Sequence, residues 1–194
     1  MIKFSNLICT VVTALIFASC AGEDEEGVNP NEQSETVLLS DISRGEGKVA
    51  ISGHETFVVD AFAVSSNLSA TINGNSYEVY RLSVTSTFDD PNDQRSVSLS
   101  FYIPVSEGRF SPPNGTFTAT TEGAALEETY VEIFVTGKDD AYNSFSNTTG
   151  TVTVSNSAEE ETFPYRFDVE FDVENLKSFD DLVVDAQGAF KWGL

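Results

Sequence analysis

Cysteine, histidine and positive charge are all scarce in this sequence. Its 194 residues include two cysteines, one histidine and ten lysines and arginines, against 31 acidic residues, so the formal net charge is −21. Nucleic-acid phosphates and anionic lipid headgroups repel such a chain. We therefore expect no nucleic-acid partner and no direct binding to anionic headgroups.

The single histidine, His54, limits the chemistry that the chain can perform. A Ser-His-Asp triad has to use it, but it lies between Gly53 and Glu55 in a stretch typical of a turn, and no Gly-x-Ser-x-Gly motif is present. A zinc site needs several nitrogen or sulfur ligands, which one imidazole cannot supply. We expect no catalytic residue, no zinc site and no enzyme activity.

Apolar runs long enough to span a membrane are also missing. The longest is Leu7–Ala18, about a dozen residues, whereas a bilayer span needs roughly 20. It follows Lys3 and ends in small residues, which is the order of charged, apolar and small segments in a secretion signal. A short membrane anchor or a core helix are the alternatives.

The apolar run ends in a cysteine, and this ending carries a family resemblance. Phe17-Ala18-Ser19-Cys20 resembles the lipobox of bacterial lipoproteins, although Leu is usual where Phe17 stands. In that family the cysteine thiol receives a diacylglyceryl group, the signal is cut before it, and the new amino terminus is acylated. The resemblance implies a signal peptide over residues 1–19 and a lipidated Cys20. With Cys9 removed and Cys20 modified, no disulfide remains.

Acidic residues follow the cysteine almost at once: Glu23, Asp24, Glu25 and Glu26. This run resembles the acidic export signal of surface lipoproteins of Bacteroidota, and it implies a place on the outer face of the outer membrane. The alternative is a solvated acidic linker. Residues 20–40 are then the lipidated cysteine with a flexible tether, and residues 41–194 a single β domain.

Alternation of apolar and polar residues dominates from Gly47 onward, as in strands with one face on a core and one in water. Two segments alternate most cleanly. Their expected inward residues are Val97, Leu99, Phe101 and Ile103 in the first, and Tyr165, Phe167, Val169, Phe171 and Val173 in the second. Further strands are expected at Lys48–Ser52, Phe57–Val64, Ser76–Thr87, Thr116–Thr120, Tyr130–Thr136, Thr151–Ser155 and Val183–Trp192.

Turn signals such as Asn73-Gly74 separate these segments. Thr121–Tyr130 is the one stretch in which we expect a helical turn. Short strands with regular turns and polar faces predict an all-β fold, an antiparallel β-sandwich of about 8–10 strands. A flattened up-and-down, calycin-like barrel is the alternative.

Three groups of residues are candidates for chemistry. The outward acids of the second alternating segment are Asp168, Glu170, Asp172 and Glu174. Their spacing meets the distance rule for glycoside hydrolysis, as any such row does, and a solvated strand face is the better explanation. Calcium candidates are Asp89, Asp90, Asn92 and Asp93, with Asp139 and Asp140 in a second loop; ordinary turns are the alternative. Tyr102, on a serine-rich face, is the candidate for ligand binding.

The whole chain is similar in style to small β-rich surface lipoproteins of Bacteroidota whose functions are uncharacterised, and no functional residue carries over from them. We predict a lipid-anchored protein facing the cell exterior that presents a non-catalytic β domain for a glycan or another ligand. A structural or adhesive component of the cell envelope is the alternative. A glycoside hydrolase is a weaker one.

Overall fold

The computed structural model describes residues 36–86, 94–105, 112–121, 129–156 and 166–193. Strands dominate these residues, which confirms the predicted all-β class. The elements in chain order are η1 (Leu39–Asp41), β1 (Gly47–Ile51), β2 (Glu55–Val59), β3 (Ala61–Ile72), β4 (Asn75–Thr85), β5 (Ser96–Pro104), β6 (Gly115–Ala119), β7 (Tyr130–Thr136), β8 (Ala141–Asn143), β9 (Thr149–Asn156), β10 (Phe167–Ser178) and β11 (Val183–Trp192).

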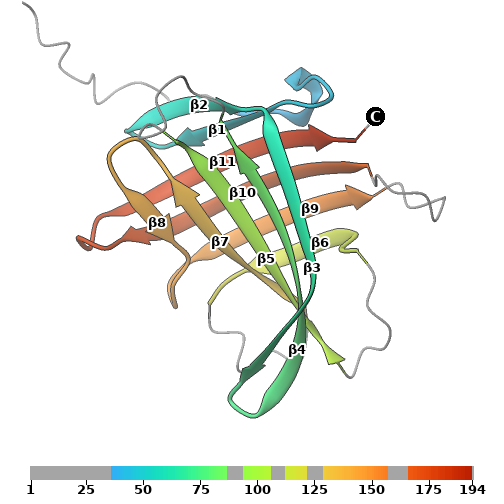
Figure 1. Cartoon of the computed structure of the whole chain (residues 1–194). Coiled ribbons are helices and arrows are strands. Elements are labelled where there is room, and N and C mark those ends of the chain that lie inside the picture. The colour runs from blue at the N-terminus through green and yellow to red at the C-terminus, as the bar shows by residue number, and fades with distance from the viewer. Residues whose placement is uncertain (1–35, 87–93, 106–111, 122–128, 157–165, 194) are drawn as a thin grey trace, which may run out of the picture.

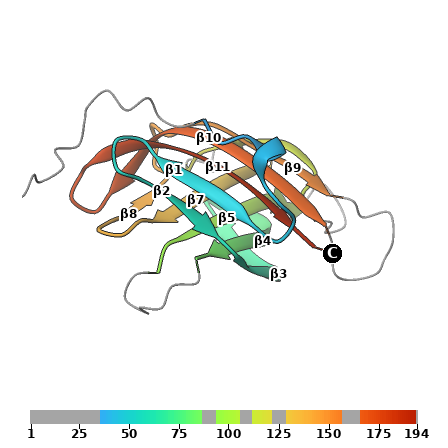
Figure 2. The ribbon, with the colours of Figure 1, turned by 90° about the horizontal axis from the view of Figure 1, so that it is seen from above.

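All the strands belong to one sheet, in the order β2-β1-β11-β10-β9-β6-β7-β5-β4-β3. The short strand β8 pairs with both β10 and β7, so β10, β9, β6, β7 and β8 form a closed ring of five strands. The half of the sheet around β9, β10 and β11 lies over the half around β3, β4, β5 and β7, with crossed strand directions (Figures 1 and 2). The two layers of a sandwich are therefore parts of a single sheet that folds over on itself.

The core fills the space between the two halves. Val97, Leu99 and Phe101 of β5 are fully buried, and so are Val169 and Val173 of β10, as the alternation predicts. Each such side chain contributes about 1.5–3 kcal/mol by leaving water. Antiparallel pairing holds throughout the described strands except between β6 and β7, which pair in parallel over two residues.

The expected strand over Phe57–Val64 is in fact two strands that meet at Asp60. There the chain leaves β2 at one edge of the sheet and enters β3 at the other edge. β3 continues to Ile72 through small and polar residues that show no clear alternation, so this part of the strand was not predicted. The Asn73-Gly74 turn is confirmed, with the positive φ angles (49° and 87°) that a type I′ hairpin requires. Most of the predicted helical turn, residues 122–128, lies outside the described residues.

Residues 36–46, here called the N-terminal arm, pack on the outer surface of β1, β10 and β11. Val37 and Ile42 are buried against Ala50 and Ala189. Backbone hydrogen bonds join Gly45 and Glu46 to Lys191 of β11. The arm therefore brings its own apolar side chains to a sheet face that would otherwise meet water.

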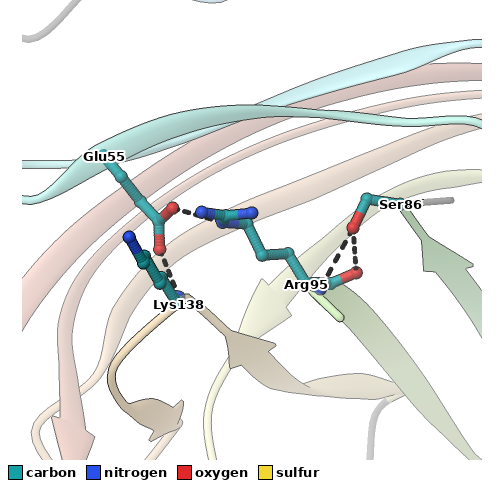
Figure 3. A network of polar contacts seen from close by, with 4 residues as sticks. All are labelled: Glu55, Ser86, Arg95 and Lys138. Atoms are coloured by element: carbon teal, nitrogen blue, oxygen red, sulfur yellow. Dashed lines mark hydrogen bonds and ion pairs between the residues drawn. The ribbon is translucent and has the colours of Figure 1, made fainter. Parts of the chain in front are cut away.

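An ion pair ties the edge strand β2 to the opposite half of the sheet (Figure 3). Arg95 Nε donates to Glu55 Oε2 at 2.5 Å, and the backbone N–H of Lys138 donates to Glu55 Oε1 at 2.6 Å. Ser86 in turn accepts from the Arg95 backbone N–H at 3.0 Å. We call these contacts the Glu55 latch. Gly137 makes room for it, because a Cβ there would lie 2.5 Å from Glu55 Oε1.

Candidate functional site

Several predicted sites fall outside the described residues and stay predictions. These are the lipidation and export residues Cys20, Glu23, Asp24, Glu25 and Glu26, and the calcium candidates Asp89, Asp90, Asn92 and Asp93. In the described ranges, no cluster of three or more His, Cys, Asp or Glu side chains is arranged to hold a metal ion. Nor does any helix in those ranges have the length and apolar character needed to cross a membrane.

His54 and the loop around Asp140 form ordinary turns. The His54 N–H donates to the Ile51 carbonyl at 3.0 Å in the turn between β1 and β2, as expected, and its exposed ring lies 5.9 Å from that of Tyr142. Asp140 Oδ1 accepts the N–H of Ala141 at 2.7 Å. That contact fits the interpretation of Asp139 and Asp140 as turn residues.

The outward acids of β10 hold the N-terminal arm and a neighbouring strand. Asp168 accepts a hydrogen bond from Arg44 at 2.5 Å, and Glu170 accepts one from the Leu39 N–H at 3.4 Å. Glu174 accepts from the Thr149 hydroxyl of β9 at 3.3 Å. β10 lies between β9 and β11, so these acids do not protect an edge. A solvated face was the simplest interpretation of this row. In the structure, the N-terminal arm contacts part of it.

A different arrangement lies on the outer face of β4, β5 and β7. The strand register places Arg81, Ser100 and Glu132 in one row across the three strands. A hollow of about 280 Å³ lies over this row, and we call it the polar groove. The lining residues that matter below are Arg81, Ser98, Ser100, Glu132, Phe134 and Asn143.

Arg81 and Glu132 give the polar groove one fixed donor and one fixed acceptor. Arg81 is exposed, and its Nε donates to the Ser100 hydroxyl at 3.0 Å. Within the described part of the chain, its terminal amino groups have no hydrogen-bond or ion-pair partner. The Tyr102 hydroxyl donates to Glu132 Oε2 at 2.8 Å, and no donor to Oε1 of Glu132 is found within the described ranges.

Burial raises the pKa of both Glu132 and Tyr102. Burial raises the pKa of Glu132, while the Tyr102 hydrogen bond and the Arg81 charge act in the opposite direction. Burial, followed by the hydrogen bond to Glu132, raises the pKa of Tyr102 to about 12. Tyr102 therefore stays a neutral donor at all physiological pH values, and it fixes the rotamer of the carboxyl group beside it.

Three tyrosine rings pack against one another next to Glu132. The ring of Tyr102 stacks on that of Tyr130 with centroids 4.8 Å apart and planes 4° from parallel. Tyr77 meets both rings edge-on, at 6.2 Å and 5.8 Å. Tyr130 is fully buried, and its hydroxyl has no partner in the described structure. Tyr102, the predicted ligand-binding residue, therefore lies beside the polar groove with its ring packed and its hydroxyl bound to Glu132.

Sequence reasoning missed Arg81, Glu132 and Phe134. Each is on the polar side of an alternating strand, which is the only signal that the sequence offers. Their meeting depends on β5 pairing with β7, a strand that is not adjacent to it in the chain. Phe134 is 36% exposed and lines the groove, so it adds an exposed aromatic ring to a mostly polar lining.

Comparisons of the chain with profiles of protein families, with curated proteins and with solved structures gave no match. Function is therefore inferred from the geometry of the polar groove and from the composition of the chain.

Proposed function

We propose that this protein is a lipid-anchored protein of the outer-membrane surface whose β domain binds a saccharide or a similar polar ligand without transforming it. The observation that carries the binding role is the polar groove, with an arginine and a carboxyl group fixed in one row. Its volume of about 280 Å³ is near the lower end of the roughly 300–1,000 Å³ of small-molecule sites. A groove of that size suits one sugar unit of a longer glycan.

The chemistry of the lining fits a sugar ring. The terminal amino groups of Arg81 can donate to hydroxyl oxygens, and Glu132 Oε1 can accept from a neighbouring hydroxyl. Ser98 and Asn143 offer both donors and acceptors along the same wall. The exposed ring of Phe134 supplies an apolar surface against which the C–H face of a sugar packs. Tyr102 acts as a positioning residue through Glu132.

The balance of charge favours a neutral saccharide. Arg81 and Glu132 have opposite charges within one row, so a neutral ligand satisfies both without leaving either uncompensated. An acidic saccharide would meet Glu132 and the field of a chain with net charge −21. We therefore expect neutral glycans to bind more tightly than uronic or sialylated ones.

A binding role without turnover is supported by the same lining. Glu132 is the one carboxyl group among the described residues around the polar groove, whereas glycoside hydrolysis ordinarily uses two. His54 lies at the turn between β1 and β2 and is not one of the residues that line the polar groove. The acids of β10 contact the N-terminal arm and β9.

A glycan array tests the binding role. The mature chain, made soluble by Cys20→Ser, is applied to neutral and acidic glycans with and without calcium, and bound glycans are assayed for cleavage. We expect binding to neutral glycans, no cleavage, and loss of binding in Arg81→Ala and Phe134→Ala. Tyr102→Phe keeps the ring stack and removes the bond to Glu132, so we expect weaker binding. Cleavage would assign the chain to the hydrolases, and absence of binding to every glycan would refute the proposal.

Cell fractionation tests the lipid anchor. The expected lipidation of Cys20 rests on the lipobox resemblance, so Cys20→Ala should move the protein from the membrane to the soluble periplasmic fraction. Replacing Glu23, Asp24, Glu25 and Glu26 with Gln is the matched comparison: it should leave the protein in the membrane and lower its labelling on whole cells. Membrane retention of the Cys20→Ala protein would contradict the anchor.

A further inference from the structure

β3 is an edge strand of unusual length and composition. It has twelve residues and, among the described strands, pairs only with β4. Along a free edge, every second residue presents an unpaired N–H and C=O to its surroundings. Most side chains of β3 are exposed, including Leu68 at 39%.

Charge and proline, two of the usual protections of an edge, are absent from its sequence. AFAVSSNLSATI contains no charged residue and no proline, although charged residues make up 21% of the chain. Natural edge strands are commonly short, charged, bulged or covered. β3 has one such device, a break in register between Ser65 and Leu68. The other edge, β2, has five residues, and the Glu55 latch holds it to the opposite half of the sheet.

The two halves of β3 have different surroundings. Phe62, in the first half, stacks on Trp192 at 4.4 Å and packs against the ends of β10 and β11. Beyond the register break, β3 and β4 form a hairpin that projects from the body of the sheet and ends at the Asn73-Gly74 turn (Figure 1). Among the described strands, residues 68–72 pair only with β4.

We propose that two copies of this chain pair antiparallel through residues 68–72 of β3, about a two-fold axis near Ala70. This arrangement places Leu68 of one copy opposite Ile72 of the other and joins the two sheets into one. An isologous contact needs only a self-complementary patch, which an uncharged strand provides. Since each copy has a net charge of −21, the uncharged edge is where two copies approach with the least repulsion.

A charged partner strand fits this edge less well than a second copy does. β3 has no acidic or basic side chain with which to select such a partner. The same charge argument predicts a salt dependence: added salt screens the repulsion between two acidic copies, so the association should strengthen as salt is raised. The pairing does not involve the polar groove, and it stands if glycan binding fails.

Sedimentation velocity over a concentration series, at low and high salt, tests the pairing with the mature chain carrying Cys20→Ser. We expect a monomer–dimer equilibrium that shifts toward dimer with salt. Thr71→Lys places a positive charge from each copy close to the axis, and it should lower the association constant at least about tenfold. The matched control is Thr56→Lys, an exposed threonine on the other edge, β2, which should leave the constant unchanged.

Thermal melting establishes that both lysine variants fold, so a loss of dimer reports on the edge alone. Hydrogen exchange provides a second readout, because pairing should protect amides of residues 68–72 as the protein concentration rises. A chain that stays monomeric at every concentration and salt overturns the proposal. A dimer that survives Thr71→Lys, or dissociates in Thr56→Lys, overturns it as well. The proposal is also overturned if a different protein binds β3 and the chain does not associate with itself.

Discussion

The outer face of β10 and the outer face of β4, β5 and β7 both carry polar side chains, and each has an arginine beside a carboxyl group. On β10, Arg44 of the N-terminal arm is held by Asp168 and by the carbonyl of Trp192. On the other face, Arg81 contacts Ser100 through Nε, and its terminal amino groups have no partner among the described residues. The first face is covered by a segment of the same chain, and the second is hollowed.

This difference shows that alternation predicts which face of a strand is polar, but not whether another segment of the chain covers that face. The carboxyl groups of β10 fix a covering segment, and the buried Val37 and Ile42 of that segment provide the larger part of the energy. An ion pair as exposed as Arg44–Asp168 contributes only about 0–1 kcal/mol. On the groove face, no comparable apolar cover is found among the described residues, and Arg81 and Phe134 there are exposed.

The largest expected effect comes from adding a methyl group to one glycine in each half of the sheet, because the surroundings of the two glycines differ. Gly150 of β9 has φ 121°, and a Cβ there would lie 2.2 Å from the Asp172 carbonyl oxygen of β10. Gly150→Ala should lower the free energy of unfolding by about 3 kcal/mol. Gly74, in the β3–β4 hairpin, has φ 87° and nothing within 4 Å, so Gly74→Ala should lower it by only about 1 kcal/mol. Urea denaturation measures both, and equal losses would contradict the difference in packing.

The next effect in size comes from truncating one apolar residue on each outer face to alanine. Ile42→Ala removes a side chain that is 9% exposed in the N-terminal arm, and we expect a loss of about 2 kcal/mol in the free energy of unfolding with unchanged glycan binding. Phe134→Ala should lower the free energy by less than about 1 kcal/mol and abolish binding. Thermal melts and a glycan titration give both quantities for each variant. The reverse pattern would assign the ligand to the arm side of the sheet.

A smaller effect concerns pH. Because burial raises the pKa of Glu132, the folded state holds its proton to a higher pH than the unfolded state does, whose ordinary value is 4.5. Between 4.5 and the raised pKa, the contribution of Glu132 to stability falls as pH rises. Glu132→Gln should remove this part of the pH dependence and make the protein more stable near neutral pH than the wild type. Denaturation at a series of pH values checks the slope, and an unchanged slope would contradict the burial of the carboxyl group.

Much of the fold was predictable because period two is a local property. The burial of Val97, Leu99 and Phe101 follows from spacing alone, and so does the turn at Asn73-Gly74. The second half of β3 was missed because its small polar residues give no alternation, and β8 because three residues are too few to show a period.

The candidate site was less predictable than the fold. Tyr102 was singled out because its ring is on a polar face, but Arg81 and Glu132 come from strands that meet through long-range pairing. The covering of β10 by the N-terminal arm depends on Val37, which belongs to the expected tether of residues 20–40, and on Ile42 at the start of the expected domain. Such contacts join distant parts of the chain, and single-sequence periodicity has no access to them.

Amide chemical-shift mapping, with the glycan that binds most tightly, tests the central claim most directly. The account predicts that shifts concentrate on Arg81, Ser100, Glu132 and Phe134 of the outer face of β4, β5 and β7. It also predicts that Arg81→Ala abolishes them while its matched control on the other face, Arg44→Ala, leaves them in place. Shifts concentrated on Asp168, Glu170 and their neighbours on β10, or shifts that survive Arg81→Ala, would contradict it.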